Sequence, residues 1–299
     1  MPKIRIGTSE RGGTFWTEGK SIATLFKRDY GIDPEIIDAS QASIENAKRL
    51  DAGLIELGFM ASNWIGCAYR GDHPFNKPID IRMVAPANSG AMFFITQADS
   101  DLKYVRDLVG KRVSIGPKGS GMVQHIHTIF GALDISFSDF EPVYLSFLEG
   151  SEAIKNGYVD AQWQCPYPNV IMDDISQQQD VRVLDYSPAD LKTIFEKVEF
   201  YRLEKMPGGL FRGLDKNTDQ VAVINVVGTH ARTDPEIVRQ FVTTMLNNLE
   251  ELAVINPLFI GLDRLFEPIR LYGKAAIEFG GVHIHPGALD AYRDKGYLS

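Results

Sequence analysis

An internal echo constrains the fold of this chain more than any other feature. Residues 3–14 and 112–122 share one order of elements, namely a strand, a glycine, a loop with a pair of glycines, and the start of a helix. Farther along, residues 52–59 and 156–163 both give a helix end, a glycine, an apolar pair, an acid and a strand that ends in an aromatic residue. The echo predicts two βαβ halves of like construction, and its period is too long for a solenoid.

Strands and helices alternate along the chain, which predicts an α/β fold. Expected strands cover residues 3–7, 35–39, 57–60, 81–87, 92–96, 112–116, 142–145 and 220–227. Expected helices cover residues 14–27, 43–52, about 121–130, 146–157, 233–255 and 286–295. Two of these helices open with the spacing of a capping box, Ser146 with Glu149 and Thr233 with Glu236.

The echo also predicts the domain organisation. Lobe one should comprise residues 1–87 plus 222–299, and lobe two residues 88–221. The chain should cross between the lobes near Met92 and near Val223. Paired crossings of this kind form a hinge, so we expect two α/β lobes with a ligand cleft between them.

Composition excludes several classes of protein. The 299 residues are 44% hydrophobic and 23% charged, which argues against disorder, and no apolar run approaches the roughly 18 residues of a membrane helix. The net charge of −8 disfavours nucleic acid as a partner. Because Lys3 follows Met1-Pro2 without an apolar leader, we expect either a cytoplasmic protein or a mature periplasmic form that has lost its signal peptide.

The two glycine-containing loops are the candidate binding elements. A loop that opens a helix exposes backbone N–H groups at the positive end of the helix dipole, and glycine lets a ligand approach that backbone closely. The loops therefore predict a site for a small anion, although either loop alone could merely form a tight turn. The candidate residues of these loops are Thr8, Ser9, Arg11, Gly13, Thr14, Gly119, Ser120 and Gly121.

Further candidates follow the strand that closes each half. Ser62 and Asn63 come after the strand at 57–60, and Trp163, Gln164 and Asn169 hold the matching place in the second half. Trp163 is either a wall of the site or an ordinary core residue. Arg11 and Lys118 either pair with a ligand carboxylate or are solvated loop charges.

Signatures of enzymes and metal sites are absent from the sequence. No GxSxG or HExxH motif occurs, and Cys67 and Cys165 form no CxxC pair. His125 and His127 should diverge on a helix, whereas His283 and His285 should share a strand face with no acid to complete a metal set. We therefore expect a binding protein with no catalytic residue, metal or cofactor.

Two alternatives belong to other classes of protein. One is an enzyme on the same two-lobed scaffold, for which Glu10, Arg11 and Cys165 are the suggestive residues. The other is a cytoplasmic ligand sensor, which would need a partner protein because no DNA-binding segment is present.

The order of motifs resembles the TAXI family, the solute-binding subunits of tripartite ATP-independent periplasmic (TRAP) transporters. The resemblance rests on Ile6-Gly7-Thr8, Gly12-Gly13-Thr14-Phe15, Ser43-Ile44-Glu45-Asn46, residues 53–59, residues 107–116, Gly119-Ser120-Gly121, residues 156–161 and His285-Pro286-Gly287-Ala288. It implies a type II periplasmic-binding-protein fold, a small organic acid or amino acid as ligand, and a TRAP membrane permease as partner of a monomer.

By the same resemblance, the ligand-lining residues are Thr8, Ser9, Gly13, Thr14, Ser62, Asn63, Ser120 and Gly121. The chain departs from the family pattern at Glu10-Arg11, at Met122 and at residues 162–165. These departures lie where the identity of the ligand should be decided.

Overall fold

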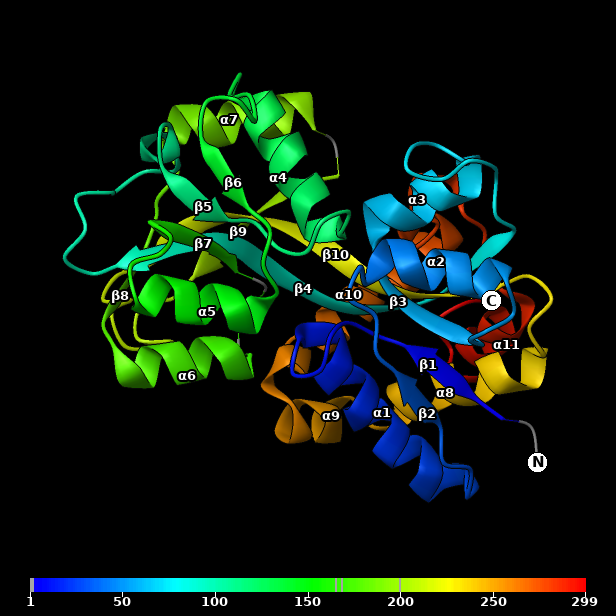
Figure 1. Ribbon diagram of the computed structural model, residues 1–299. Coiled ribbons are helices and arrows are strands. Elements are labelled where there is room, and N and C mark those ends of the chain that lie inside the picture. Colours follow the sequence, from blue (N-terminus) through cyan, green and yellow to red (C-terminus); the bar gives the residue numbers. More distant parts are fainter. Residues whose placement is uncertain (1–2, 165, 168, 199) are drawn as a thin grey trace. The chain divides into compact units, whose positions relative to one another are not determined.

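The computed structural model describes residues 3–164, 166–167, 169–198 and 200–299 (Figure 1). The chain forms two compact units, unit 1 (Met1–Ser89 and Ile224–Ser299) and unit 2 (Gly90–Val223). It passes from one unit to the other within two long strands, β4 (Ile81–Gln97) and β10 (Thr218–His230). Each unit is described below by itself.

Unit 1 contains a mixed sheet in the order β2-β1-β3-β10-β4. β1 (Arg5–Gly7) runs parallel to β2 (Glu35–Ile37) and β3 (Leu57–Ala61), and β10 runs antiparallel to β3. Its helices are α1 (Thr14–Tyr30), α2 (Ser43–Asp51), α3 (Ser62–Arg70), α8 (Pro235–Asn247), α9 (Leu249–Ile255), α10 (Leu262–Tyr272) and α11 (Pro286–Asp294), with 3-10 turns η2 (Pro257–Phe259), η3 (Gly273–Ala276) and η4 (Phe279–Gly281). Figure 1 shows α2 and α3 on one face of the sheet and α1 and α8 on the other.

Unit 2 repeats this plan with the strand order β4-β7-β5-β6. β5 (Arg112–Ser114) runs parallel to β6 (Glu141–Val143) and β7 (Ala161–Gln164), whereas β8 (Val181–Val183) pairs antiparallel with β4, and β9 (Arg202–Met206) with β10. Its helices are α4 (Gly121–Ala132), α5 (Phe147–Lys155), α6 (Val170–Gln178) and α7 (Pro188–Lys197), with the 3-10 turn η1 (Val105–Leu108). α4 and α7 cover one face of the sheet, and α5 and α6 cover the other (Figure 1).

The internal echo reappears as the same set of hydrogen bonds in both units. In unit 1 the Arg5 guanidinium donates to both carboxylate oxygens of Glu56 at 2.6 and 3.1 Å, and to the Gly53 carbonyl at 3.0 Å. In unit 2 Arg112 donates to Asp160 at 2.8 and 3.2 Å, and to the Gly157 carbonyl at 3.0 Å. Each arginine thus fastens the first strand of its unit to the turn before the third strand, and the bidentate geometry fixes that turn.

Several local predictions are confirmed. The Ser146 hydroxyl accepts from the Glu149 N–H and the Glu149 carboxylate accepts from the Ser146 N–H, so α5 begins with the predicted capping box. α1 starts at Thr14 and ends before Gly31, whose φ of 70° is the left-handed conformation that suits a glycine after a helix.

Other local predictions are wrong. The expected strands at 81–87 and 92–96 are one strand, β4, which continues through the turn-like Asn88-Ser89-Gly90, where Asn88 Oδ1 accepts from the Asn225 amide of the neighbouring β10 at 2.9 Å. The Thr233 capping box does not form, since Asp234 is the N-cap of α8 and accepts from the Glu236 N–H. The helix expected over 233–255 is two helices, α8 and α9, that meet at Asn248.

Five helices and strands were missed entirely, namely α3, α6, α7, β8 and β9. α3 follows β3 without a side-chain cap, because its N-cap is Ala61, so no capping signal marks its start.

Within the described residues, no helix is long and apolar enough to cross a bilayer.

Candidate functional site

In unit 1 the loop between β1 and α1 carries the first group of predicted residues. Gly13 is the N-cap of α1, and an added Cβ there would lie 2.7 Å from the Ser9 Oγ, so the turn requires glycine. The Ser9 hydroxyl accepts from the Trp16 N–H at 3.2 Å, which satisfies the third N–H group of the helix. The N–H groups of Thr14 and Phe15 have no acceptor in the helix itself, so they remain available to an anion.

Two buried polar residues hold this loop in place. The Thr8 N–H and hydroxyl both donate to the Ile37 carbonyl, at 2.9 and 3.1 Å, which joins the loop to β2. The Asn46 side-chain amide donates to the Thr8 carbonyl at 2.8 Å and to the Phe59 carbonyl at 2.9 Å. Asn46 therefore joins the ends of β1 and β3, from which the loop and α3 emerge.

Unit 1 also buries polar atoms that lack a hydrogen-bond partner among the described residues. They include Thr14 Oγ1, Glu18 Oε2, Asn46 Oδ1, Asn63 Oδ1, Ser89 Oγ and Thr244 Oγ1. Thr14 and Asn63 are predicted site residues, and Thr14 and Glu18 are four positions apart, so they share one face of α1. Unsatisfied buried polar atoms are costly, and the two on this face of α1 mark a place where a bound solute or water would complete the hydrogen bonding.

Glu18 is the most unusual of these residues. Its side chain is fully buried, and burial raises the pKa of its carboxyl to about 8 while the hydrogen bond from Asn88 lowers that pKa in part. The Asn88 amide donates to Glu18 Oε1 at 2.6 Å, and the Asn225 amide donates to Asn88 Oδ1 at 2.9 Å. This chain of bonds links α1 to β4 and β10 at the positions where both strands border unit 2.

In unit 2 the loop before α4 repeats the geometry found in unit 1. Gly119 has a φ of 77°, and Ser120 is the N-cap of α4. The Ser120 hydroxyl accepts from the Val123 N–H, which is again the third N–H group of its helix. The N–H groups of Gly121 and Met122 are left without an acceptor in the helix, as are those of Thr14 and Phe15 in unit 1.

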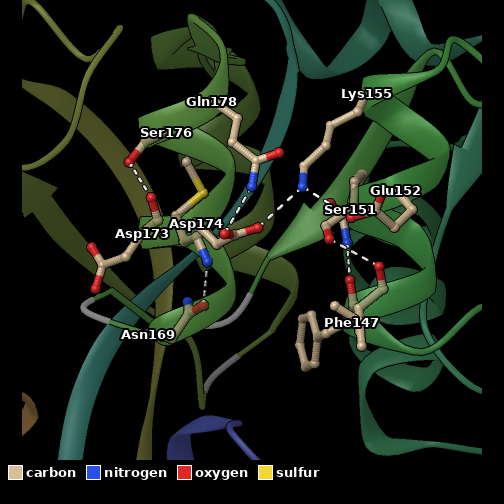
Figure 2. Close-up of polar contacts among 12 residues, drawn as sticks. Phe147, Ser151, Glu152, Lys155, Asn169, Asp173, Asp174, Ser176 and Gln178 are labelled. Carbon is tan, nitrogen blue, oxygen red and sulfur yellow. Dashed lines mark hydrogen bonds and ion pairs between the residues drawn. The ribbon is translucent and has the colours of Figure 1, made fainter.

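The predicted residues Gln164 and Asn169 lie on the α5–α6 face of unit 2. The Gln164 amide donates to Gln162 Oε1 at 3.0 Å, and Gln164 Oε1 is buried without a partner among the described residues. Asn169 is the N-cap of α6 and accepts from the Met172 N–H at 2.8 Å. Figure 2 shows Asn169 at the start of α6, and it shows Lys155 of α5 reaching to Asp174 of α6 at 3.0 Å.

The other predicted residues are described by their burial and by their contacts with the protein itself. Trp163 is buried against Phe94, with ring centroids 4.7 Å apart, so it belongs to the core on the α4 face. Arg11 is exposed and lies 3.9 Å from the Asp38 carboxylate. Ser62 is buried and begins α3. Cys165 lies outside the described residues.

The histidines are accounted for by packing and capping. His125 is buried and its Nδ1 lies 2.7 Å from the Tyr201 hydroxyl, and burial lowers the pKa of this imidazole to about 4. His127 stacks on Phe137 on a different side of α4, as predicted. His283 and His285 flank Ile284, which forms an isolated parallel bridge with Met83, and His285 is also the N-cap of α11 and accepts from the Gly287 N–H. The expectation that no acid lies near them is wrong, because His283 Nδ1 is 3.3 Å from the Glu278 carboxylate. Among the described residues, no cluster of three or more histidine, cysteine, aspartate or glutamate side chains could hold a metal ion.

The sequence analysis missed Glu18, Asn88 and Asn225. Glu18 follows Thr14 by one helical turn, and this spacing could have placed it beside the loop. Asn88 and Asn225 lie within the two strands that were expected to cross between lobes, so their position was a usable signal.

These features define an α/β protein with the fold of the periplasmic binding proteins. MatC from Rhodopseudomonas palustris, solved with bound malate, superposes with a TM-score of 0.58 at 14% identity, covering 86% of this chain and 88% of MatC. A putative periplasmic sulfonate-binding protein SsuA from Methylobacillus flagellatus KT gives 0.54 at 15% identity over 100% and 97% of the two chains. The effector-binding domain of a BenM variant gives 0.53 at 10% identity over 86% and 97%. The predicted fold class is therefore confirmed.

The chain belongs to the NMT1-like family, whose model matches residues 6–296. This match covers both units and every predicted site residue. The finer resemblance to the TAXI family stays a prediction.

Proposed function

We propose that this protein is a periplasmic solute-binding protein that captures a small organic anion, a carboxylate or an amino acid, between its two units and delivers it to a TRAP-type membrane permease. The observation that carries the proposal is the repeated helix N-terminus. In each unit a serine hydroxyl accepts from the third N–H group of the helix, which leaves the first two N–H groups for an anionic ligand. The fold shared with MatC and SsuA supports a transport role.

The proposed ligand-binding residues are those of the two loops and of the segments that follow β3 and β7. In unit 1, Thr8, Ser9, Gly13 and Thr14 shape the loop, while Ser62 and Asn63 begin the neighbouring helix. In unit 2 the corresponding residues are Gly119, Ser120, Gly121, Gln164 and Asn169. Closure of the two units over the ligand would exclude water and strengthen these hydrogen bonds.

Direct identification of the ligand tests the proposal. The protein is purified without added ligand, and the released small molecules are identified by mass spectrometry. In parallel, thermal unfolding is followed with malate, succinate, L-glutamate, L-arginine, taurine and methanesulfonate. The proposal expects at least one anion to raise the unfolding midpoint, with saturation. If only solutes without a carboxylate or sulfonate group bind, the anion assignment is wrong.

A second candidate function is a ligand-sensing module, which the fold shared with the BenM effector-binding domain favours. A sensor would bind its anion equally well but would act on a partner protein instead of a permease. Reconstitution separates the two functions. Uptake of the ligand into vesicles that contain a TRAP-type permease supports transport if that uptake requires this protein. Turnover of the bound ligand would instead indicate an enzyme.

A further inference from the structure

One arginine of unit 2, Arg202, forms no ion pair among the residues that the structure describes. Arg202 begins β9, and its register partner on β10 is Ala222, next to the border between the units at Val223. Side chains alternate along a strand, so Arg202 shares a face with Met206. Met206 packs in the core cluster of the α5–α6 face together with Phe93 and Met172. The guanidinium of Arg202 therefore extends from the same face of the sheet as Gln164, whose register partner is Phe93.

Among the described residues, every other half-buried arginine has a partner. Arg5, Arg49, Arg82, Arg112 and Arg239 pair with carboxylates, whereas Arg182 donates to backbone carbonyls. Arg202 has neither kind of partner, and its Nε is buried without an acceptor. Among the described residues no ion pair joins Arg202 to an acid, not even to Glu204 on the same strand, and burial lowers the pKa of Arg202 more than the charge of Glu204 raises it.

An uncompensated, partly desolvated cation is expensive to keep in a folded protein. Arginine is always charged at physiological pH, so the cost cannot be relieved by loss of a proton. Residues that lower the stability of a protein in this way are typical of its functional sites. The net charge of −8 adds to the argument, because an anionic solute needs a local positive charge to approach this chain.

The residue before Arg202 also contacts the helix that follows the predicted anion loop of unit 2. The preceding residue, Tyr201, contacts His125 through the 2.7 Å hydrogen bond, and His125 lies one helical turn after Gly121. The start of β9 is thus held beside the first turns of α4, while the Arg202 side chain lies on the face that carries Asn169 and Gln164.

We propose that Arg202 supplies the positive charge that binds the anionic group of the solute in unit 2, so that the ligand itself provides the missing counter-ion. The inference rests on the proposed function and adds a specificity-determining residue to the site. It assigns the ligand a carboxylate or sulfonate group, because the planar guanidinium binds such groups through two parallel hydrogen bonds.

Three variants test this role, with malate and methanesulfonate as probes in calorimetric titrations. Arg202→Met should weaken binding of whichever probe the wild type binds by at least about tenfold, and Arg202→Lys should retain part of the affinity, since lysine keeps the charge but loses the paired hydrogen bonds. Arg264→Met is the matched control, because Arg264 is exposed in unit 1 and should leave affinity unchanged.

The ligand-free unfolding midpoint separates a binding role from a structural one. Removing a cation that has no partner should leave the midpoint of Arg202→Met unchanged or raise it. A lower midpoint that Arg202→Lys restores would show a structural charge and overturn the inference. If both the wild type and Arg202→Met bind a probe equally, Arg202 is not in the site although the proposed function stands. If the wild type binds no anion, the proposed function fails and the inference fails with it.

Discussion

Replacing Glu18 with glutamine should change how the stability of the protein depends on pH. The Glu18 carboxyl is fully buried, one of its oxygens accepts from Asn88 and the other has no partner among the described residues. Burial raises its pKa from 4.5 to about 8. Glutamine preserves the shape and the acceptor for Asn88, but it cannot ionise.

The sign and size of the effect follow from proton linkage. Below pH 4.5 the carboxyl is protonated in both the folded and unfolded states. Between pH 4.5 and 8 only the folded state keeps the proton, so the free energy of unfolding falls by about 1.4 kcal/mol for each pH unit of increase. Over that interval the wild type should lose roughly 5 kcal/mol relative to Glu18→Gln, and above pH 8 the difference should level off.

Urea unfolding of both proteins at pH 5, 6, 7, 8 and 9 measures this difference. Circular dichroism follows the transition, and other titrating groups cancel because they are common to the two proteins. Glu250→Gln, at an exposed glutamate of α9, is the matched control and should give a difference that does not vary with pH. A constant difference between Glu18→Gln and the wild type from pH 5 to 8 would refute the buried neutral acid.

The remaining predictions concern the two helix N-termini. Gly13→Ala should weaken binding of the anion found in the ligand screen by several-fold and lower the unfolding midpoint, because its Cβ would lie 2.7 Å from the Ser9 Oγ; calorimetry and thermal unfolding measure both effects. Ser120→Ala should cost about 1 kcal/mol of stability in urea unfolding through loss of the bond to the Val123 N–H, and should weaken binding as well. Unchanged affinity in Ser120→Ala would remove that loop from the proposed site, whereas Leu148→Ala, an exposed position of α5, should affect neither property.

Predictions from the sequence succeeded where the same pattern of residues occurs in both halves of the chain. The strand, loop and helix around Gly13 and around Ser120 were predicted because each half supported the reading of the other, and Glu56 and Asp160 were noticed for the same reason. Their bonds to Arg5 and Arg112 explain why the pattern occurs twice, since each acid fixes the turn before a buried strand. Single occurrences offered no such internal check, and α3, which begins after Ala61 without a cap, was missed.

The residues that sequence reasoning missed are those whose surroundings depend on distant segments. Glu18 lies on a helix where glutamate is usually solvated, and only the approach of Asn88, 70 positions away, shows that it is buried. Arg202 lies in a strand with two further charged residues, Glu204 and Lys205, a pattern typical of an edge that faces water. Its lack of a partner is a property of the folded unit and of no local sequence.

The capping serines explain how one backbone design can both stabilise a helix and bind a ligand. A helix start has more N–H groups than one side chain can satisfy, and a cap bonded to the first of them would close the site. Ser9 and Ser120 bond to the third N–H group, so the stabilising bond lies inside the helix and the outermost donors stay unoccupied. The same bond to the third N–H group caps α5, α6 and α7, so binding must be measured directly. A double variant Ser9→Ala/Ser120→Ala should lose affinity for the anion in calorimetric titration as well as stability in urea unfolding, and unchanged affinity would show that the two serines only stabilise their helices.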